Sequence, residues 1–160
     1  MNRIEKLREF IDDMLLNKKD SQDRRCAYVH LYGVSLMCGL IAKKRGASVE
    51  LAIMTAMLHD LYSYKTEGVP PIEDKVVKSR KDSEVAREVL DKLNITTADE
   101  TDTICNAVCY RGVGDYSELG EILLDANIIQ HGFYNPLLPI KYGEKRLAML
   151  LIEFGIDNAE

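Results

Sequence analysis

The 160-residue sequence lacks any apolar run that reads as a transmembrane span, and its N-terminus lacks the pattern of a signal peptide. A positive charge balance is also missing, because 26 acidic residues outnumber 21 basic ones and give a net charge of -5. General nucleic-acid binders usually have a basic balance, so this class of function is disfavoured. We therefore expect a protein that neither crosses a membrane nor binds nucleic acid.

Cysteine is present, but no Cys-x-x-Cys pair occurs among the four cysteines. Without an export signal, reduced thiols in the cytosol are the simplest interpretation, and we expect a cytoplasmic location. Cys105 and Cys109 stand four residues apart on one helical face and could share a metal. Small buried thiols are the commoner use of such residues.

Strand patterns are absent too, because no segment alternates convincingly between apolar and polar residues, whereas helical spacing recurs along the chain. The spacing predicts an all-α fold with helices over 3–17, 21–45, 49–62, 80–94, 98–111, 118–131 and 143–154. Residues 63–78 contain Gly68, Pro70 and Pro71 and predict a loop. The length fits one compact domain over residues 1–160.

Capping residues set the start of most of these helices. A side-chain oxygen at the N-cap accepts a hydrogen bond from a backbone amide of the first turn. A Glu three residues later can complete a capping box. The predicted caps are Asp20, Ser48, Ser79 with Asp82, Thr97 with Glu100, and Ser117.

Histidine is scarce, yet two of the three histidines fall on helix faces that are predicted to be buried. His30 lies on the inner stripe of its helix, the pair His59-Asp60 ends an apolar helix, and Asp125 faces inward from a third helix. Singly, each has an ordinary explanation as a satisfied core histidine, a cap or an ion-pair member. Buried carboxylates are costly unless paired, hydrogen-bonded or metal-bound. Together, the four residues predict a mixed nitrogen and oxygen site for a divalent cation.

These residues resemble the motif of the HD-domain superfamily of metal-dependent phosphohydrolases, and small bacterial members in particular. The matching features are His30, the stretch from Ala56 to Leu61 that holds His59-Asp60, and Asp125 within residues 123–127. The resemblance covers roughly residues 20–132. It implies a bundle of about six to seven helices in which His30, His59, Asp60 and Asp125 bind one divalent metal ion. The ion could be Mn, Fe, Ni, Co, Zn or Mg.

The resemblance also implies the activity, which is hydrolysis of a phosphoric ester with water activated by the metal. The expected substrate is a nucleotide or another small phosphomonoester. Asp60 is the candidate catalytic residue, since a carboxylate beside a metal can orient or deprotonate the attacking water.

Cationic and aromatic residues near these helices are candidates for substrate binding, because Lys and Arg suit phosphate and Tyr can stack on a base or sugar. The candidates are Lys65, Arg111, Arg25 and Tyr64. For the tyrosine, packing in the core or anchoring of the loop is the commoner role. The further group Lys75, Lys78, Arg80 and Lys81 is more simply a solvated face.

Two departures from the family pattern leave other functions open. No histidine lies between His59 and Asp125, so a second metal is not expected, and position 63 is Ser where some nucleotidases of the family carry Glu. The alternative function is a catalytically weak or inactive metal-binding module that senses a ligand. A metal-free helical interaction protein is the third. His131 projects about 240° from Asp125 on an ideal helix and is expected to border the pocket rather than bind the metal.

Overall fold

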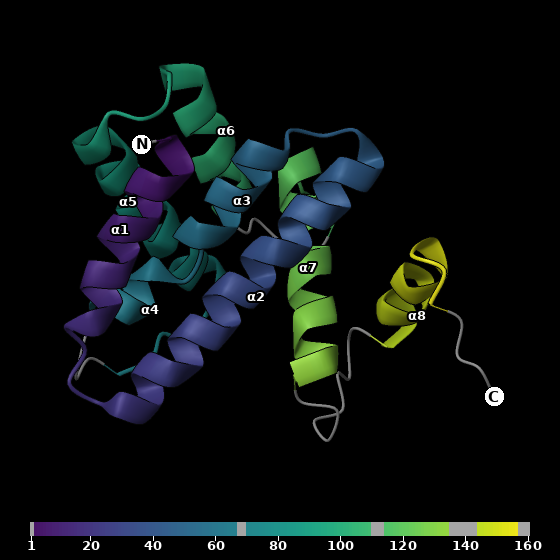
Figure 1. Ribbon diagram of the computed structural model, residues 1–160, viewed down its shortest axis with the longest axis horizontal. Helices are drawn as coiled ribbons and strands as arrows, with labels where there is room; N and C mark the ends of the chain where they lie inside the picture. Colours follow the sequence, from purple (N-terminus) through teal and green to yellow (C-terminus); the bar gives the residue numbers. More distant parts are fainter. Residues whose placement is uncertain (1, 67–69, 110–113, 135–143, 157–160) are drawn as a thin grey trace.

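The structure is a computed structural model and describes residues 2–66, 70–109, 114–134 and 144–156. These residues form helices and no strands (Figure 1), which confirms the all-α prediction. The described helices are α1 (Arg3–Leu16), α2 (Ser21–Arg45), α3 (Val49–Leu58), α4 (Leu61–Lys65), α5 (Lys75–Leu93), α6 (Ala98–Val108), α7 (Glu118–Tyr134) and α8 (Glu144–Glu153).

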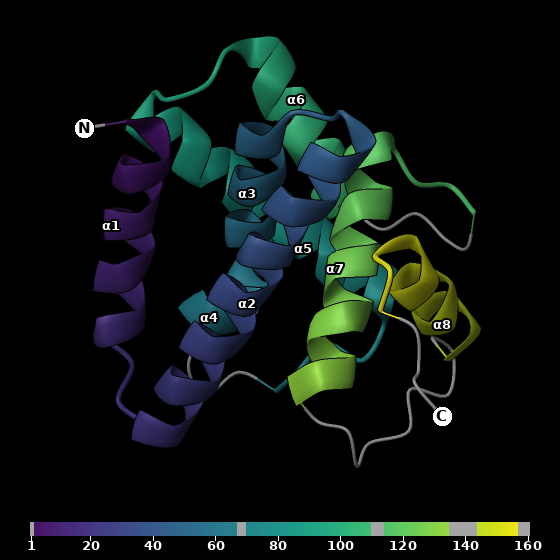
Figure 2. The same ribbon diagram turned by 45° about the vertical axis from the view of Figure 1, so that its right-hand side comes forward.

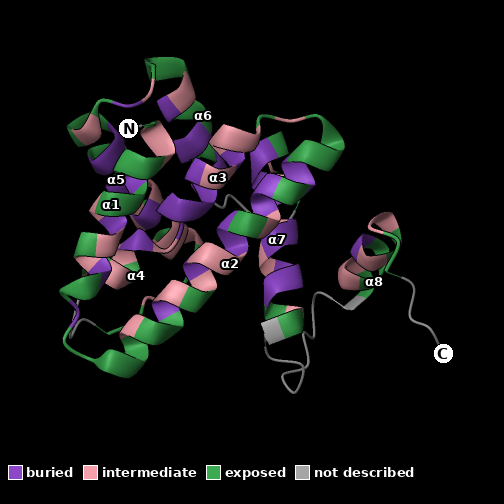
Figure 3. Cartoon of the chain, in the orientation of Figure 1, coloured by how far each residue is buried: buried purple, intermediate pink, exposed green. Residues whose placement is uncertain are grey.

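Two groups of buried side chains form the core, and α2 and α3 contribute to both. The first group joins these helices to α1, α4, α5 and α6, with Leu7, Leu31 and Leu58 among its fully buried members. The second joins them to α7 and α8 and includes Ile41 and Ile122. Figure 2 shows α7 between α2 and α8, and Figure 3 shows buried residues along α3 and α7. The His-Asp pair lies at the end of α3, flanked in the chain by Leu58 and Leu61 of the first group.

Helix α2 has the predicted bounds and both predicted ends. The Asp20 side chain accepts hydrogen bonds from the amides of Gln22 and Asp23, and Gly46 ends the helix in the left-handed conformation. By length and composition alone α2 could cross a membrane. Here its buried face packs against α3 and α7, and core helices of soluble proteins pass the same test.

The largest departure from the predicted helices is a break at the His-Asp pair, where one helix over 49–62 was expected. Helix α3 ends at Leu58, His59 is extended, and Asp60 adopts the left-handed conformation with φ 63° before α4 begins. This break raises the number of helices from the predicted seven to eight in the described part of the chain. Consecutive residues of a helix project about 100° apart, so the break lets two neighbouring side chains reach one point. Asp tolerates this conformation better than most residues with a side chain.

The start of α5 is the second correction. The helix begins at Lys75 and is capped by Asp74, which accepts from the amides of Val76 and Val77. The predicted cap, Ser79, lies inside the helix, and Asp82 is used for a contact with α4. The predicted loop over 63–78 therefore contains most of α4 and the first turn of α5. The capping box of Thr97 and Glu100 on α6 is present as predicted.

Candidate metal centre

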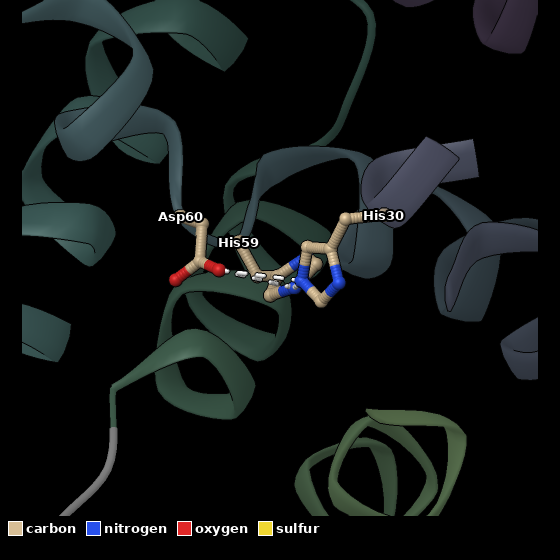
Figure 4. A group of neighbouring side chains, drawn as sticks. All are labelled: His30, His59 and Asp60. Atoms are coloured by element: carbon tan, nitrogen blue, oxygen red, sulfur yellow. Dashed lines mark hydrogen bonds and ion pairs between the residues drawn. The ribbon is translucent and has the colours of Figure 1, made fainter. Parts of the chain in front are cut away.

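His30, His59 and Asp60 converge on one point from α2 and from the break between α3 and α4 (Figure 4). The Nε2 atoms of the two histidines are 3.1 Å apart. Asp60 Oδ2 lies 3.4 Å from His30 Nε2 and 3.6 Å from His59 Nε2. Donors bound to one ion at about 2.1 Å, with angles of about 90° to 120°, are separated by about 3.0–3.6 Å. The three atoms therefore have the spacing of ligands on one side of a single divalent ion.

Hydrogen bonds on the far side of each ring fix which nitrogen carries the proton. His30 Nδ1 lies 3.1 Å from Gln130 Oε1, and His59 Nδ1 contacts the carbonyl oxygen of Ala56. Both oxygens only accept, so both Nδ1 atoms donate, and in the neutral rings both Nε2 atoms present lone pairs. Metal-binding histidines are typically oriented by such partners.

With neutral rings, the cluster thus consists of three acceptors that face one another, and no other described residue donates to these three atoms. A proton on His30 would satisfy one pair of these atoms, whereas a divalent ion satisfies all three. Burial lowers the pKa of His59 below its ordinary value of 6.5, although Asp60 opposes this shift. The neutral form of a buried imidazole is the one that binds a metal. The residues present fit a divalent metal ion.

Lys78 of α5 contacts the other oxygen of Asp60, Oδ1, and donates to Asp82 Oδ2 at 2.8 Å. Burial opposes ionisation of Asp60, but His59 and His30 in their protonated forms, and Lys78, outweigh it and hold the Asp60 pKa well below its usual range. A carboxylate kept ionised in this way suits a metal ligand better than a proton acceptor. Asp82 in turn accepts from the amide of Tyr62 at 3.0 Å. The sequence pattern places Lys78 on a solvated face and Asp82 at a cap, and neither prediction includes this chain of contacts.

Asp125 is the predicted ligand that the structure places elsewhere. It is buried as expected, but its Oδ2 lies 2.7 Å from Arg45 Nη1 and its Oδ1 lies 2.5 Å from Arg146 Nε. Both oxygens are thus engaged by cations from α2 and α8. The inward stripe of α7 was predicted correctly, but it faces the second core group and not the His-Asp pair.

Another face of α7 reaches the metal centre instead. Gln130 bonds His30, and the His131 ring lies 5.1 Å from the His30 ring between centroids. Around a helix, residue 130 lies about 140° from residue 125 and residue 131 about 240° from it. One helix therefore cannot direct all three side chains at one point. His131 borders the site, as its spacing from Asp125 predicted. The role of Gln130 had no signal in the sequence, since glutamine is common on helix surfaces.

A cavity of about 280 Å³ opens beside His30, between the start of α2 and α4. Its volume is near the lower end for small-molecule sites, which hold roughly 300–1,000 Å³. The lining residues are Lys18, Asp23, Cys26, Ala27, His30, Ser63 and Tyr64. Of the four predicted substrate-binding residues, Tyr64 is the one in this lining, and its role in substrate binding stays a prediction.

The other three predicted substrate-binding residues are not in this lining. Lys65 pairs with Glu88 at 2.9 Å on an exposed surface, and Arg25 is exposed on α2. Arg111 lies outside the described residues. The four cysteines are free, with Cys105 buried and Cys109 half-buried, and neither joins the cluster.

The family model described as HD domain matches residues 27–131, which is more than half of the chain. The chain belongs to the HD domain family. The match spans both histidines of the cluster and most of the helices that position them. HD domains bind divalent metals, and a cluster of suitable ligand residues, His30, His59 and Asp60, is present here. No match was found among curated proteins or solved structures.

Proposed function

We propose that this HD domain is a metal-dependent phosphohydrolase that acts on a nucleotide or another small phosphomonoester. The observation that carries the proposal is the acceptor-only cluster of His30, His59 and Asp60, of which His30 also lines a cavity of about 280 Å³. One divalent metal ion from the series Mn, Fe, Ni, Co, Zn and Mg fills this cluster, and two imidazoles favour a transition metal over Mg.

A bound divalent ion supplies a Lewis acid for a phosphoryl oxygen and lowers the pKa of water. The residues of the chain provide the rest. Gln130 and the Ala56 carbonyl hold the two rings with their Nε2 atoms toward the ion. Lys78 keeps Asp60 ionised and fixes its direction through Oδ1. His30, His59 and Asp60 would hold the ion, and Tyr64 lines the cavity beside His30 that the rest of the substrate would fill.

Ser63 favours a second candidate function, a metal-binding module that senses a ligand with little or no turnover. Its side chain is exposed and lines the cavity at the position where some relatives carry a Glu. Asp60 is the carboxylate of the described metal cluster, and it is paired with Lys78. Both candidates share the metal and the cavity and differ only in turnover. A cytoplasmic location and a small-molecule partner fit either candidate.

The deciding experiment is elemental analysis of protein purified without chelator, with His59→Ala prepared in parallel. We expect about one equivalent of a transition metal in the wild type and none in the variant. Lys65→Met is the matched control, because this residue pairs on the surface away from the cluster and should leave the metal content unchanged.

The same metal-loaded protein is then assayed for phosphate release from nucleoside monophosphates and simple phosphomonoesters. Release that disappears in His59→Ala supports the hydrolase. Full metal content without release from any phosphoester supports the sensing module. Absence of metal from the wild type, even after dialysis against each candidate ion, would refute both.

A further inference from the structure

Lys18 is a charged residue that the fold buries beside the metal centre. Only 9% of its surface is exposed, whereas lysine is rarely buried without a partner of opposite charge. Its Nζ donates to the carbonyl oxygen of Tyr64 at 3.3 Å. Among the described residues, no carboxylate lies within ion-pair distance of this ammonium group. A neutral carbonyl compensates only part of the cost of burying the charge.

The backbone of Lys18 is fixed on both sides, so the position of its side chain is not incidental. Its amide donates to the carbonyl of Leu15 at 3.1 Å, and its carbonyl accepts from Arg24 Nη1 at 3.0 Å. The connection between α1 and α2 is thus held to α2, and the ammonium group is held against the last turn of α4. Such preorganisation lowers the entropic cost of binding a ligand.

Lys18 and His30 line the same cavity of about 280 Å³. The cavity therefore joins a buried cation to a metal ligand, with Cys26 and Ala27 along the wall between them on α2. Asp23 is the acidic lining residue, and its side chain is exposed. Water screens the exposed carboxylate more than it screens the buried ammonium group.

We propose that this cavity is an anion subsite, in which Lys18 receives a second negatively charged group of the substrate. The proposal rests on the proposed function for the role of the metal end, where the first phosphoryl group binds. The ligand class is a small molecule with two anionic groups, at least one of them a phosphate. A merely structural role, in which Lys18 caps the carbonyl end of α4, predicts no effect of this charge on anion binding.

Alkylation of Cys26 reports on the cavity without any need for metal or turnover. Full-length protein is treated with iodoacetamide in chelator at increasing concentrations of inorganic phosphate, and the modification of each cysteine is followed by mass spectrometry. We expect phosphate to protect Cys26, while Cys109, which lies outside the cavity lining, is modified at an unchanged rate.

Lys18→Met keeps most of the length of the side chain and removes its charge. We expect the concentration of phosphate that half-protects Cys26 to rise about 10–100-fold, as for loss of a charge-assisted hydrogen bond. The control Lys19→Met loses the same charge from an exposed position that is not in the lining, and it should match the wild type. Equal protection in Lys18→Met and the wild type, or no protection in the wild type, would overturn the proposal.

Asp23→Asn tests the proposal in the event that Lys18→Met does not fold. Removal of the negative charge from the lining should lower the half-protecting concentration of phosphate, and an unchanged value would count against the subsite. Since these assays contain no metal, they separate the subsite from the hydrolase. With an active metal-loaded enzyme, Lys18→Met should raise KM for substrates with two phosphates and leave KM for p-nitrophenyl phosphate unchanged. An equal rise for both would place Lys18 at the hydrolysed phosphate and refute the second-group assignment.

Discussion

At the scale of single residues, the structure separates two kinds of buried charge. Asp60 and the two histidines of the cluster leave acceptor atoms facing one another, which is the arrangement of a site that takes up a cation. Asp125 is just as deeply buried, but Arg45 and Arg146 neutralise both of its oxygens. Burial alone therefore does not identify a metal ligand. The groups that contact each carboxylate oxygen distinguish a candidate ligand from a member of an ion pair.

Asp125→Asn should lower the free energy of unfolding by about 1–3 kcal/mol and leave the metal content unchanged. The loss follows from charge-assisted bonds to two arginines that are themselves partly exposed and can regain water. Urea denaturation measures the first quantity and elemental analysis the second. Loss of metal at unchanged stability would instead make Asp125 a ligand, as the resemblance to the family implied.

Thr55→Val should raise the free energy of unfolding by about 1 kcal/mol. The hydroxyl of Thr55 is buried and has no hydrogen-bond partner in the described part of the chain, so its replacement by a methyl group removes an uncompensated desolvation cost. Thr101→Val is the matched control, because the buried hydroxyl of Thr101 is bonded to Thr96 at 2.8 Å and its loss should destabilise. A decrease in stability for Thr55→Val would show that this hydroxyl is satisfied in solution.

At the scale of the elements, helical spacing and caps predicted where most helices lie, since these signals are local. The errors fall where a tertiary contact outweighed a local preference. The predicted helix over 49–62 is interrupted at His59 and Asp60, and the break brings both side chains to one point. Asp82, predicted to cap α5, instead accepts a hydrogen bond from the Tyr62 amide. The site follows the same rule. His30, His59 and Asp60 were predicted from one stripe and one dipeptide. Lys78 and Gln130 were not, because their roles depend on how α5 and α7 pack.

The start of α5 offers a direct test of the corrected boundary. Asp74→Ala removes an oxygen that accepts from two backbone amides and should cost about 1 kcal/mol. Ser79→Ala, at the cap predicted from the sequence, removes a hydroxyl that donates to the Val76 carbonyl inside the helix and should change stability by less than about 0.5 kcal/mol. Thermal denaturation of the two variants measures both losses of stability. A larger loss for Ser79→Ala than for Asp74→Ala would support the helix start predicted from the sequence.

At the scale of the whole molecule, long-range ion pairs join helices that are distant in the sequence. Arg3 of α1 bonds Glu50 of α3 at 2.6 Å and Glu100 of α6 at 2.9 Å. Arg45 of α2 bonds Glu153 of α8 at 2.8 Å. No local pattern predicts such pairs, because they depend on packing of the finished core. They are also partly exposed, so each contributes modestly and depends on pH and salt.

Arg3→Met should cost about 1 kcal/mol at neutral pH, and this difference from the wild type should vanish in acid. The hydrogen bond to Arg3 lowers the pKa of Glu50 below its ordinary value of 4.5, and the bond to the Thr97 amide followed by Arg3 lowers that of Glu100. A lowered folded-state pKa gives stability that is present above pH 4.5 and lost as the pH falls below it. Denaturation across this range, with exposed Arg8→Met as control, checks the prediction. A difference that persists in acid would assign the effect to packing.

The three facing acceptors carry a consequence for the life of the protein in a cell. Without a cation the cluster holds lone pairs at close range inside the fold, so the proposed metal ion would stabilise the folded chain. Binding to the native state alone shifts the balance between folded and unfolded chains by mass action. Unfolded chains are the ones that proteases remove. Under the proposed metal binding, the supply of the ion would govern how long each copy survives, and scarcity of the ion would shorten the half-life of the protein.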